Sequence, residues 1–204
     1  MKTLLRTLHA PVYERRLQVL VELIGQRLPA GESLLDIGCG AGTLGSALDR
    51  EHGIEVRGLE TNVREGCAIP VDPYDGKTIP FEDDSLDNVL LADVLHHEEN
   101  PGRLLREAGR VARKRVIVKD HKTGSFLAWP RIAFLDWGAN AGYGVRCLFR
   151  YPSQAGWHEL FGQCGLGVEE ERISLNLYPP FLNLIFGKRL QYFAVLSPTR
   201  QKSK

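Results

Sequence analysis

One short stretch restricts the fold of this 204-residue chain more than any other: residues 34–45, Leu-Leu-Asp-Ile-Gly-Cys-Gly-Ala-Gly-Thr-Leu-Gly. Its apolar start, which ends at Asp36, predicts a short buried strand, and Thr43 to Arg50 are helix formers. The glycines between them permit a tight turn with positive φ and let a ligand lie against the backbone. Free N–H groups at the start of the helix would donate to an anion or a carboxylate. The stretch therefore predicts a strand, a glycine loop and a helix that bind a nucleotide-like ligand.

The order of the acid and the glycines indicates which ligand to expect. Residues 40–45 satisfy the Gly-x-Gly-x-x-Gly pattern of dinucleotide-binding folds. However, Asp36 precedes the first glycine, and a carboxylate there would repel a pyrophosphate and attract a cofactor that carries an ammonium and a sulfonium. Residues 36–42, Asp-Ile-Gly-Cys-Gly-Ala-Gly, resemble motif I of the class I S-adenosylmethionine-dependent methyltransferases. The resemblance implies S-adenosyl-L-methionine as cofactor, bound by Asp36, Gly38, Cys39, Gly40 and Gly42.

A second acidic residue is expected beside this loop. Residues 54–60 alternate apolar and polar side chains and predict a second strand that ends at Glu60. Glu60 lies one helix and one strand beyond the glycines, the spacing at which an acid accepts hydrogen bonds from the ribose hydroxyls of a nucleoside ligand. Rossmann dehydrogenases use the same device, so Glu60 does not choose between the two cofactors.

Residues 74–87, Tyr-Asp-Gly-Lys-Thr-Ile-Pro-Phe-Glu-Asp-Asp-Ser-Leu-Asp, carry the second resemblance. They look like the Asp-x-x-x-Leu-Pro-Phe-x-Asp-x-Ser-Phe-Asp segment of methyltransferases related to those of ubiquinone and menaquinone biosynthesis, with Ile79 and Leu86 as departures. The resemblance implies that Asp75 accepts a hydrogen bond from the adenine amino group and that the Gly76 backbone faces the ring edge. Alternatively, Asp75 caps an Asx turn before Gly76, and both roles can coexist.

Two further runs predict central strands whose carboxyl ends carry candidate site residues. The first run begins at residue 88, is almost wholly apolar and ends near Asp93. The second run, residues 116–119, leads to Asp120 and His121. Ligands of an open α/β sheet bind at the carboxyl ends of its parallel strands. We therefore expect Asp93 to contact the cofactor. Asp120, His121 and His97 are candidate bases for an acceptor that must lose a proton.

No metal is predicted from the sequence. Two adjacent histidines on a turn, His96 and His97, are expected to point in different directions, and no third ligand is evident, which favours cofactor packing or acid–base chemistry. The four cysteines, at positions 39, 67, 147 and 164, have no Cys-x-x-Cys spacing and are expected to be reduced thiols.

Residues 122–150 break the alternation of strands and helices and combine aromatic residues with glycines. In the family that the motifs resemble, this region varies and builds a lid over the acceptor, so we expect a lid here. Phe134, Trp137 and Tyr143 would supply apolar walls, and Asp136, Asn140 and Arg146 would orient the acceptor. Asp136 is also a candidate base. The alternative is an ordinary aromatic-rich loop that packs on the sheet.

The remaining segments complete the expected fold class, an α/β, Rossmann-like, doubly wound sheet of seven mostly parallel strands with helices on both faces and an antiparallel last strand. An apolar stripe over residues 12–28 predicts a covering helix within an N-terminal segment, residues 1–30. Residues 67–71 predict the third strand, residues 153–164 a helix, and residues 168–177 and 190–196 the closing strands. The length fits one methyltransferase domain over residues 1–204.

Composition and charge indicate which kinds of partner to expect. The net charge of +1 gives no overall attraction to nucleic acid, and the fourth strand is not followed by the Asn-Pro-Pro-Tyr-like segment of base-modifying relatives. No apolar run approaches the length of a membrane span, and residues 1–12 lack the apolar core of a signal peptide. We therefore expect a cytoplasmic protein with no nucleic-acid partner.

The leading hypothesis is methyl transfer from S-adenosylmethionine to a small-molecule acceptor by in-line displacement, with the protein mainly holding the reactants together and a general base acting where the acceptor needs one. An NAD(P)-dependent oxidoreductase that uses the same glycine loop is one alternative, and a non-catalytic cofactor-binding protein is the other. The sequence predicts neither the acceptor nor the oligomeric state.

Overall fold

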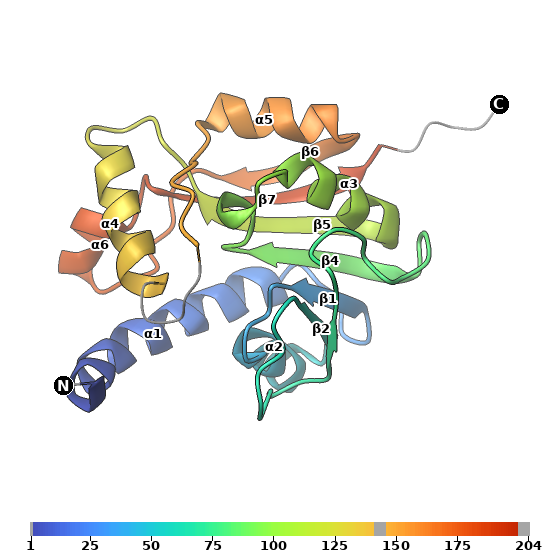
Figure 1. Ribbon diagram of the computed structural model, residues 1–204, viewed down its shortest axis with the longest axis horizontal. Coiled ribbons are helices and arrows are strands. Elements are labelled where there is room, and N and C mark those ends of the chain that lie inside the picture. The colour runs from blue at the N-terminus through green and yellow to red at the C-terminus, as the bar shows by residue number, and fades with distance from the viewer. Residues whose placement is uncertain (1, 141–145, 200–204) are drawn as a thin grey trace.

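The computed structural model describes residues 2–140 and 146–199 (Figure 1). These residues form a sheet of seven strands in the order β3-β2-β1-β4-β5-β7-β6. The parallel strands are β1 (Ser33–Ile37), β2 (Glu55–Glu60), β3 (Val71–Pro73), β4 (Leu86–Ala92) and β5 (Ala112–His121). β7 (Gln191–Pro198) runs antiparallel to both β5 and β6 (Leu166–Arg172). The predicted fold class is therefore confirmed.

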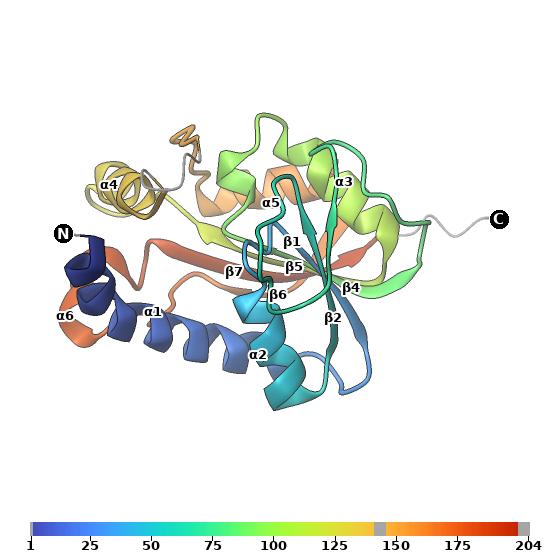
Figure 2. The same cartoon turned by 60° about the horizontal axis from the view of Figure 1, so that its bottom comes forward.

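Helices cover both faces of the sheet (Figure 2). α1 (Lys2–Gly25) and α2 (Thr43–His52) pack on one face, and α3 (Pro101–Val111) and α5 (Gln154–Gln163) pack on the other. The short 3-10 helix η1 (Leu95–His97) follows β4 directly. α4 (Ala128–Asn140) and α6 (Pro180–Phe186) lie together at one end of the molecule, near the start of α1 (Figures 1 and 2).

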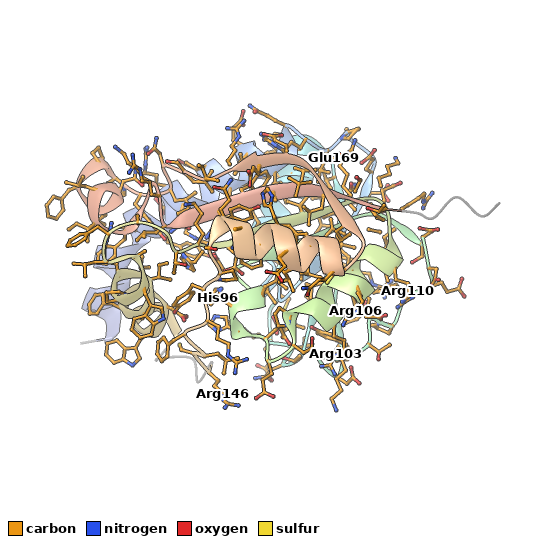
Figure 3. The ribbon with its side chains drawn as sticks, turned by 90° about the horizontal axis from the view of Figure 1, so that it is seen from above. His96, Arg103, Arg106, Arg110, Arg146 and Glu169 are labelled. Carbon is orange, nitrogen blue, oxygen red and sulfur yellow. The ribbon has the colours of Figure 1, made fainter. Side chains whose placement is uncertain are left out.

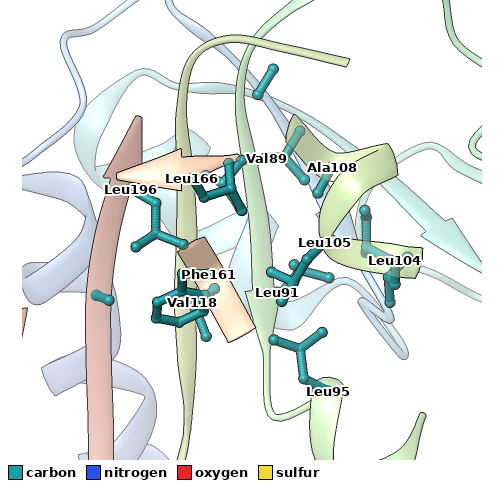
Figure 4. Close-up of a cluster of buried hydrophobic side chains, with 14 of the residues drawn as sticks. Val89, Leu91, Leu95, Leu104, Leu105, Ala108, Val118, Phe161, Leu166 and Leu196 are labelled. Carbon is teal, nitrogen blue, oxygen red and sulfur yellow. The ribbon is translucent and has the colours of Figure 1, made fainter. Parts of the chain in front are cut away.

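The apolar runs of β4 and β5 are buried on both faces because successive strand residues point to opposite sides. Val89 and Leu91 of β4 pack under α3 and α5, whereas Leu90 between them packs under α1 and α2. The α3 side of this core includes Leu105 and Phe161 (Figure 4). Each such fully buried side chain contributes about 1.5–3 kcal/mol to folding. The rigid central strands therefore hold their carboxyl ends in fixed positions.

The third strand and the N-terminal helix have other boundaries than predicted. The third strand covers Val71–Pro73 rather than residues 67–71, because the preceding residues pack on the glycine loop: the Ala68 N–H donates to the Ala41 carbonyl at 2.9 Å. The N-terminal helix begins at Lys2 and ends at Gly25 instead of covering residues 12–28, since it continues through Pro11.

Two helices were not predicted. Residues 128–140 of the expected lid form α4, and α6 lies between the two closing strands. The sixth strand ends at Arg172 rather than continuing to residue 177. Beyond it, Leu175 forms an isolated antiparallel bridge with Lys188. Leu175 belongs to the same apolar cluster as Leu90 of β4 and Ile117 of β5, so distant contacts rather than local periodicity decide the path of this segment.

Candidate functional site

The predicted glycine loop follows β1 at the carboxyl edge of the sheet. Gly40 and Gly42 have φ of +59° and +73°, which side chains other than glycine rarely adopt. A Cβ at Gly42 would lie 2.5 Å from Cγ1 of Ile69, so this glycine is required by packing. A Cβ at Gly40 would meet nothing within 4 Å. The Gly40 side of the loop is therefore the one that leaves room for a ligand.

Two carboxylates lie beside this loop, as predicted. Glu60, at the end of β2, accepts hydrogen bonds from the N–H of Gly40 at 2.8 Å and from the N–H of Thr61 at 3.1 Å. Asp36 is only 2% exposed, and its burial, together with the nearby Glu60, raises its pKa from 3.8 to about 7. A bound cation would favour the charged form of Asp36. The edge thus has the electrostatics of a site for a cationic group.

Cys39 lies within the same loop, and its thiol stays protonated. Burial, followed by the charges of Asp36 and Glu60, raises the pKa of Cys39 to about 12. A thiol with this pKa is a weak nucleophile at neutral pH. Cys39 therefore contributes volume and backbone to the loop rather than thiolate chemistry.

Asp75 forms the turn that was the alternative to adenine recognition. Its Oδ1 accepts hydrogen bonds from the N–H of Lys77 at 2.7 Å and of Thr78 at 2.9 Å, and these backbone donors lower the pKa of Asp75. Gly76 follows with a φ of +73°. The Asx-turn role is thus present, and the adenine role of Asp75 and Gly76 stays a prediction.

Asp93 is held by two cations that the sequence analysis missed. The Lys119 ammonium lies 2.5 Å from Asp93 Oδ1, and Arg16 of α1 pairs with Oδ2. Burial opposes ionisation, but Lys119 and Arg16 hold the pKa of Asp93 well below its ordinary value. Lys119 stands inside an apolar strand run, which is the signal that could have indicated a buried partner. Asp93 is anchored primarily as an ion pair, and its predicted contact with the cofactor stays a prediction.

Several of the candidate acid–base residues lie close together just after the carboxyl end of β4. His96 and His97 of η1 have ring centroids 4.0 Å apart, and Nε2 of each ring lies 3.6 Å from Oδ1 of Asp136 of α4. Asp120, at the end of β5, lies 2.7 Å from Nδ1 of His96, which is labelled in Figure 3. The expectation that the two histidines point apart, without a third ligand nearby, is therefore wrong.

The three histidines of this region differ in charge because their surroundings differ. Burial disfavours the charged form of His96, but Asp120 and Asp136 raise its pKa to about 10. Burial and the neighbouring Lys119 lower the pKa of His121 to about 4. Burial and then His96 lower the pKa of His97, whose side chain is 17% exposed. Of these three rings, His97 is the neutral one nearest to the solvent.

Tyr151 is a further member of this cluster that sequence reasoning missed. Its hydroxyl donates to Oδ2 of Asp136 at 2.5 Å, and burial raises the pKa of Tyr151. Although burial opposes ionisation, His96 and Tyr151 lower the pKa of Asp136. Tyr151 is 15 residues from Asp136 in the chain, and no sequence pattern connects the two.

The predicted aromatic lid differs from the structure. Phe134 and Trp137 are 62% and 57% exposed, so they do not form a closed apolar wall here, and their contact with an acceptor stays a prediction. Helical geometry turns Asp136 to the buried side of α4. Arg146 extends outward, 2.8 Å from Glu99 (Figure 3). Tyr143 and the side chain of Asn140 lie outside the described residues.

A cavity of about 290 Å³ opens beside this cluster. Leu95 of η1, Pro101 at the start of α3, Trp157 of α5 and Tyr151 contribute to its walls. Tyr151 thus links the cavity to Asp136. Among residues 2–140 and 146–199, no helix has the length and apolar character that a membrane crossing requires.

Comparisons with known proteins agree with this architecture. The 1,6-didemethyltoxoflavin-N1-methyltransferase of Burkholderia thailandensis, solved with 1,6-didemethyltoxoflavin and S-adenosylhomocysteine, superposes with a TM-score of 0.67 at 12% identity, covering 91% of this chain and 79% of that one. The sarcosine/dimethylglycine N-methyltransferase of Aphanothece halophytica is 27% identical across 50% of this chain and 42% of its own length.

The bifunctional methionine biosynthesis protein MetXA/MetW of Rhodopirellula baltica is 30% identical across 76% of this chain and 28% of its own length. The matched part of this chain spans about half or less of these curated relatives. The family model described as methionine biosynthesis protein MetW matches residues 19–130, more than half of the chain. The chain therefore belongs to the MetW family, and its fold is that of the class I S-adenosylmethionine-dependent methyltransferases.

Proposed function

We propose that this protein binds S-adenosylmethionine at the carboxyl edge of β1 and β2 and transfers its methyl group to a small-molecule acceptor. The observation that carries the proposal is the buried Asp36 beside Glu60 and the open side of Gly40. The carboxylates offer negative charge to a cationic cofactor, and the open side of Gly40 offers it room. Asp36 would hold the ammonium group, Glu60 the ribose, and Asp75 with Gly76 the adenine.

The strand order also favours this cofactor over a dinucleotide. The sheet carries an antiparallel β7 between β5 and β6, whereas the dinucleotide-binding Rossmann order has a parallel sixth strand at that edge. The oxidoreductase hypothesis rests on the Gly-x-Gly-x-x-Gly pattern alone. Binding measurements with both cofactor types distinguish the two hypotheses.

When bound, S-adenosylmethionine supplies a methyl group that its sulfonium makes electrophilic, so an acceptor can take it by in-line displacement. The chain's own residues would position the acceptor and exclude water. The cavity beside η1 shares Tyr151 with the His96–His97–Asp136 cluster, so an acceptor there would lie against this cluster. We propose residues 122–150, which include α4, as the cover of that acceptor.

Candidate bases differ in access to an acceptor. Asp120 and Asp136 have fully buried side chains, and His121 is 6% exposed. His97 is the most exposed and its pKa is lowered, so it is the group that would accept a proton near neutral pH. We propose that Asp120, His121 and Asp136 position this region rather than take the proton themselves.

Replacing Gly40 by valine should weaken S-adenosylmethionine binding by at least about 100-fold, because the side chain would occupy the open side of the loop. Titration calorimetry with S-adenosylmethionine, S-adenosylhomocysteine and NAD(H) gives the measurement. Gly165→Val is a matched control, since Gly165 has a φ of +70° and a Cβ there would meet nothing within 4 Å, but it lies at the other end of the sheet, before β6. It should lose similar stability and keep wild-type affinity. Equal affinities in both variants would contradict the cofactor assignment.

Asp75→Ala should reduce the preference for adenine, because the adenine amino group would lose its proposed acceptor. The preference is measured as the ratio of affinities for S-adenosylhomocysteine and S-inosylhomocysteine, in which an oxygen replaces the amino group. Loss of the turn cap should lower the melting temperature in addition, since two backbone N–H groups lose Oδ1. A lower melting temperature with an unchanged ratio would leave Asp75 as a turn cap only.

Turnover decides between an enzyme and a non-catalytic cofactor-binding protein. The assay measures S-adenosylhomocysteine release in the presence of small metabolites that offer oxygen, nitrogen, sulfur or carbon nucleophiles. Methyl transfer to a member of this panel supports the proposal. Tight cofactor binding without transfer to any class of nucleophile would favour the non-catalytic alternative.

A further inference from the structure

We propose that His96, His97 and Asp136 form a binding site for one divalent transition-metal ion of the zinc type. The ligand atoms are Nε2 of each histidine and Oδ1 of Asp136. This proposal does not rest on methyl transfer, and nothing in the sequence predicted it, because the third ligand comes from a helix 39 residues further along the chain.

The donor atoms have the spacing of metal ligands. Nε2 of His96 and Nε2 of His97 each lie 3.6 Å from the same oxygen, Oδ1 of Asp136, and all three atoms lie within 4.8 Å of one another. A distance of 3.6 Å is too long for a good direct hydrogen bond. Two ligand atoms that each lie about 2.0–2.1 Å from a tetrahedral zinc ion are separated by about 3.3 Å. A small adjustment would therefore place an ion between the three atoms.

Both histidine rings are held with Nε2 directed at Asp136. Nδ1 of His96 is 2.7 Å from Asp120 Oδ1, and Nδ1 of His97 is 3.1 Å from the Arg146 carbonyl oxygen. An acceptor at Nδ1 fixes the proton on that nitrogen, so Nε2 carries the lone pair of the neutral ring. Histidine ligands of metals almost always donate their other N–H to a carboxylate or a backbone carbonyl. Both forms of this support are present here.

The carboxylate of Asp136 is oriented in the same way. The Tyr151 hydroxyl donates to Oδ2 at 2.5 Å, which turns Oδ1 toward the two rings. The Cys147 thiol, 3.5 Å from Oδ1, donates to the same carboxylate. Two imidazoles with one carboxylate form a mixed N and O donor set, which suits zinc and its neighbours in the first transition series better than magnesium or calcium.

A second grouping, formed by Asp93, His96 and Asp120, is a poorer candidate. Lys119 and Arg16 already place two positive charges on Asp93. A metal ion there would be repelled by these cations and would have to displace them. The ion is therefore expected at Asp136, on the other side of His96.

A protonated His96 between Asp120 and Asp136 is the competing explanation of the same cluster. In that case the positive charge of His96, and not a metal ion, holds the carboxylate of Asp136, and the cluster does not need His97. The two explanations therefore differ in what His97 contributes. Substituting His97 removes a ligand from the metal site but leaves the contacts of His96 with both carboxylates in place.

The test is metal binding by the full chain in the absence of S-adenosylmethionine. The protein is stripped with a chelator, and Zn²⁺ is titrated in competition with a chromophoric chelator. Co²⁺ binding is followed by its visible absorption, which reports coordination geometry. We expect one ion per chain, an at least 100-fold loss of zinc affinity in His97→Ala and in Asp136→Asn, and a 10–100-fold loss in Tyr151→Phe.

His158→Ala is the matched control, because this histidine is exposed and pairs with Glu171 away from the cluster. It should bind zinc as the wild type does. His97→Ala removes a partly exposed ring, and circular dichroism checks that it folds. If Asp136→Asn fails to fold, His97→Ala with the Co²⁺ spectrum decides the question.

Absence of binding to Zn²⁺, Co²⁺, Ni²⁺, Mn²⁺ and Fe²⁺ would overturn the proposal, and so would binding that His97→Ala does not weaken. Because no cofactor is present in the titration, failure of methyl transfer would leave these results unaffected. Conversely, a bound ion would not by itself support methyl transfer. Because the ion would occupy Nε2 of His97, it would also exclude the base role proposed above for that ring.

Discussion

Replacing Asp36 by asparagine should abolish S-adenosylmethionine binding and, above pH 7, stabilise the folded protein. Asparagine keeps the shape of the side chain and removes the charge that the ammonium would need. The charge is also unfavourable to folding. Asp36 is 2% exposed and lies near Glu60, so the folded protein favours its neutral form, with a pKa of about 7.

The sign of the stability effect follows from linkage between proton binding and folding. The folded protein holds a proton on Asp36 up to about pH 7, whereas the unfolded chain releases it near the ordinary value of 3.8. The wild type therefore loses stability relative to the asparagine variant as pH rises from about 4 to about 7, and the difference is constant above that. Its upper limit is about 4 kcal/mol, from about 1.4 kcal/mol for each pH unit between the two pKa values.

Chemical denaturation of both proteins between pH 4 and pH 8 measures this difference. Asp87→Asn is a control of opposite sign: hydrogen bonds from Ser33 and Lys114 lower the pKa of Asp87 despite its burial, so its charge favours the folded state above pH 4. Asp87→Asn should therefore be less stable than the wild type at neutral pH. A destabilised Asp36→Asn with wild-type cofactor affinity would contradict the role given to Asp36.

The same pKa predicts how cofactor affinity changes with pH in the wild type. If only the carboxylate form of Asp36 accepts the ammonium, affinity falls about tenfold for each pH unit below 7 and is constant above it. Calorimetry in buffers of different ionisation enthalpy should detect the proton released on binding at pH 6. The asparagine variant should show neither effect.

Asp93→Asn should destabilise the protein by about 3–5 kcal/mol, the usual cost of leaving a buried charge without its partner. Lys119 has a side chain only 1% exposed, and its ammonium contacts Asp93. Burial lowers the pKa of Lys119, and Asp93 opposes that effect by stabilising the charge. For a chain of this length the loss corresponds to a fall in melting temperature of about 6–20 °C.

A second substitution tests whether the unpaired lysine causes this loss. Lys119→Met in the Asp93→Asn background replaces the ammonium by an apolar side chain of similar length and should recover at least half of the lost stability. Calorimetric melting of the wild type, both single variants and the double variant gives the coupling energy. A cost below about 1 kcal/mol for Asp93→Asn, or no recovery in the double variant, would contradict the assignment of the loss to an unpaired Lys119.

Elements governed by local rules were predictable. The strand, loop and helix around residues 34–45 follow from an apolar run, glycines and helix formers, and the structure places β1 and α2 there. α5 begins at the predicted cap, Ser153, whose hydroxyl oxygen accepts a hydrogen bond from the N–H of Gly156 at 3.1 Å. Each of these features depends on residues only a few positions apart.

The amino-acid sequence by itself determined the α/β class, the glycine loop and the acids at its strand ends, because alternation, glycine and carboxylate positions act over a few residues of chain. Only the tertiary structure decided the partners of those residues. Asp93 contacts Arg16, which is 77 positions away in the sequence, and His96 contacts Asp120, which is 24 positions away. Trp137 turned outward and Asp136 inward once α4 formed, because helical geometry places adjacent residues about 100° apart. Contacts between distant segments depend on how helices and strands pack, which no local pattern encodes.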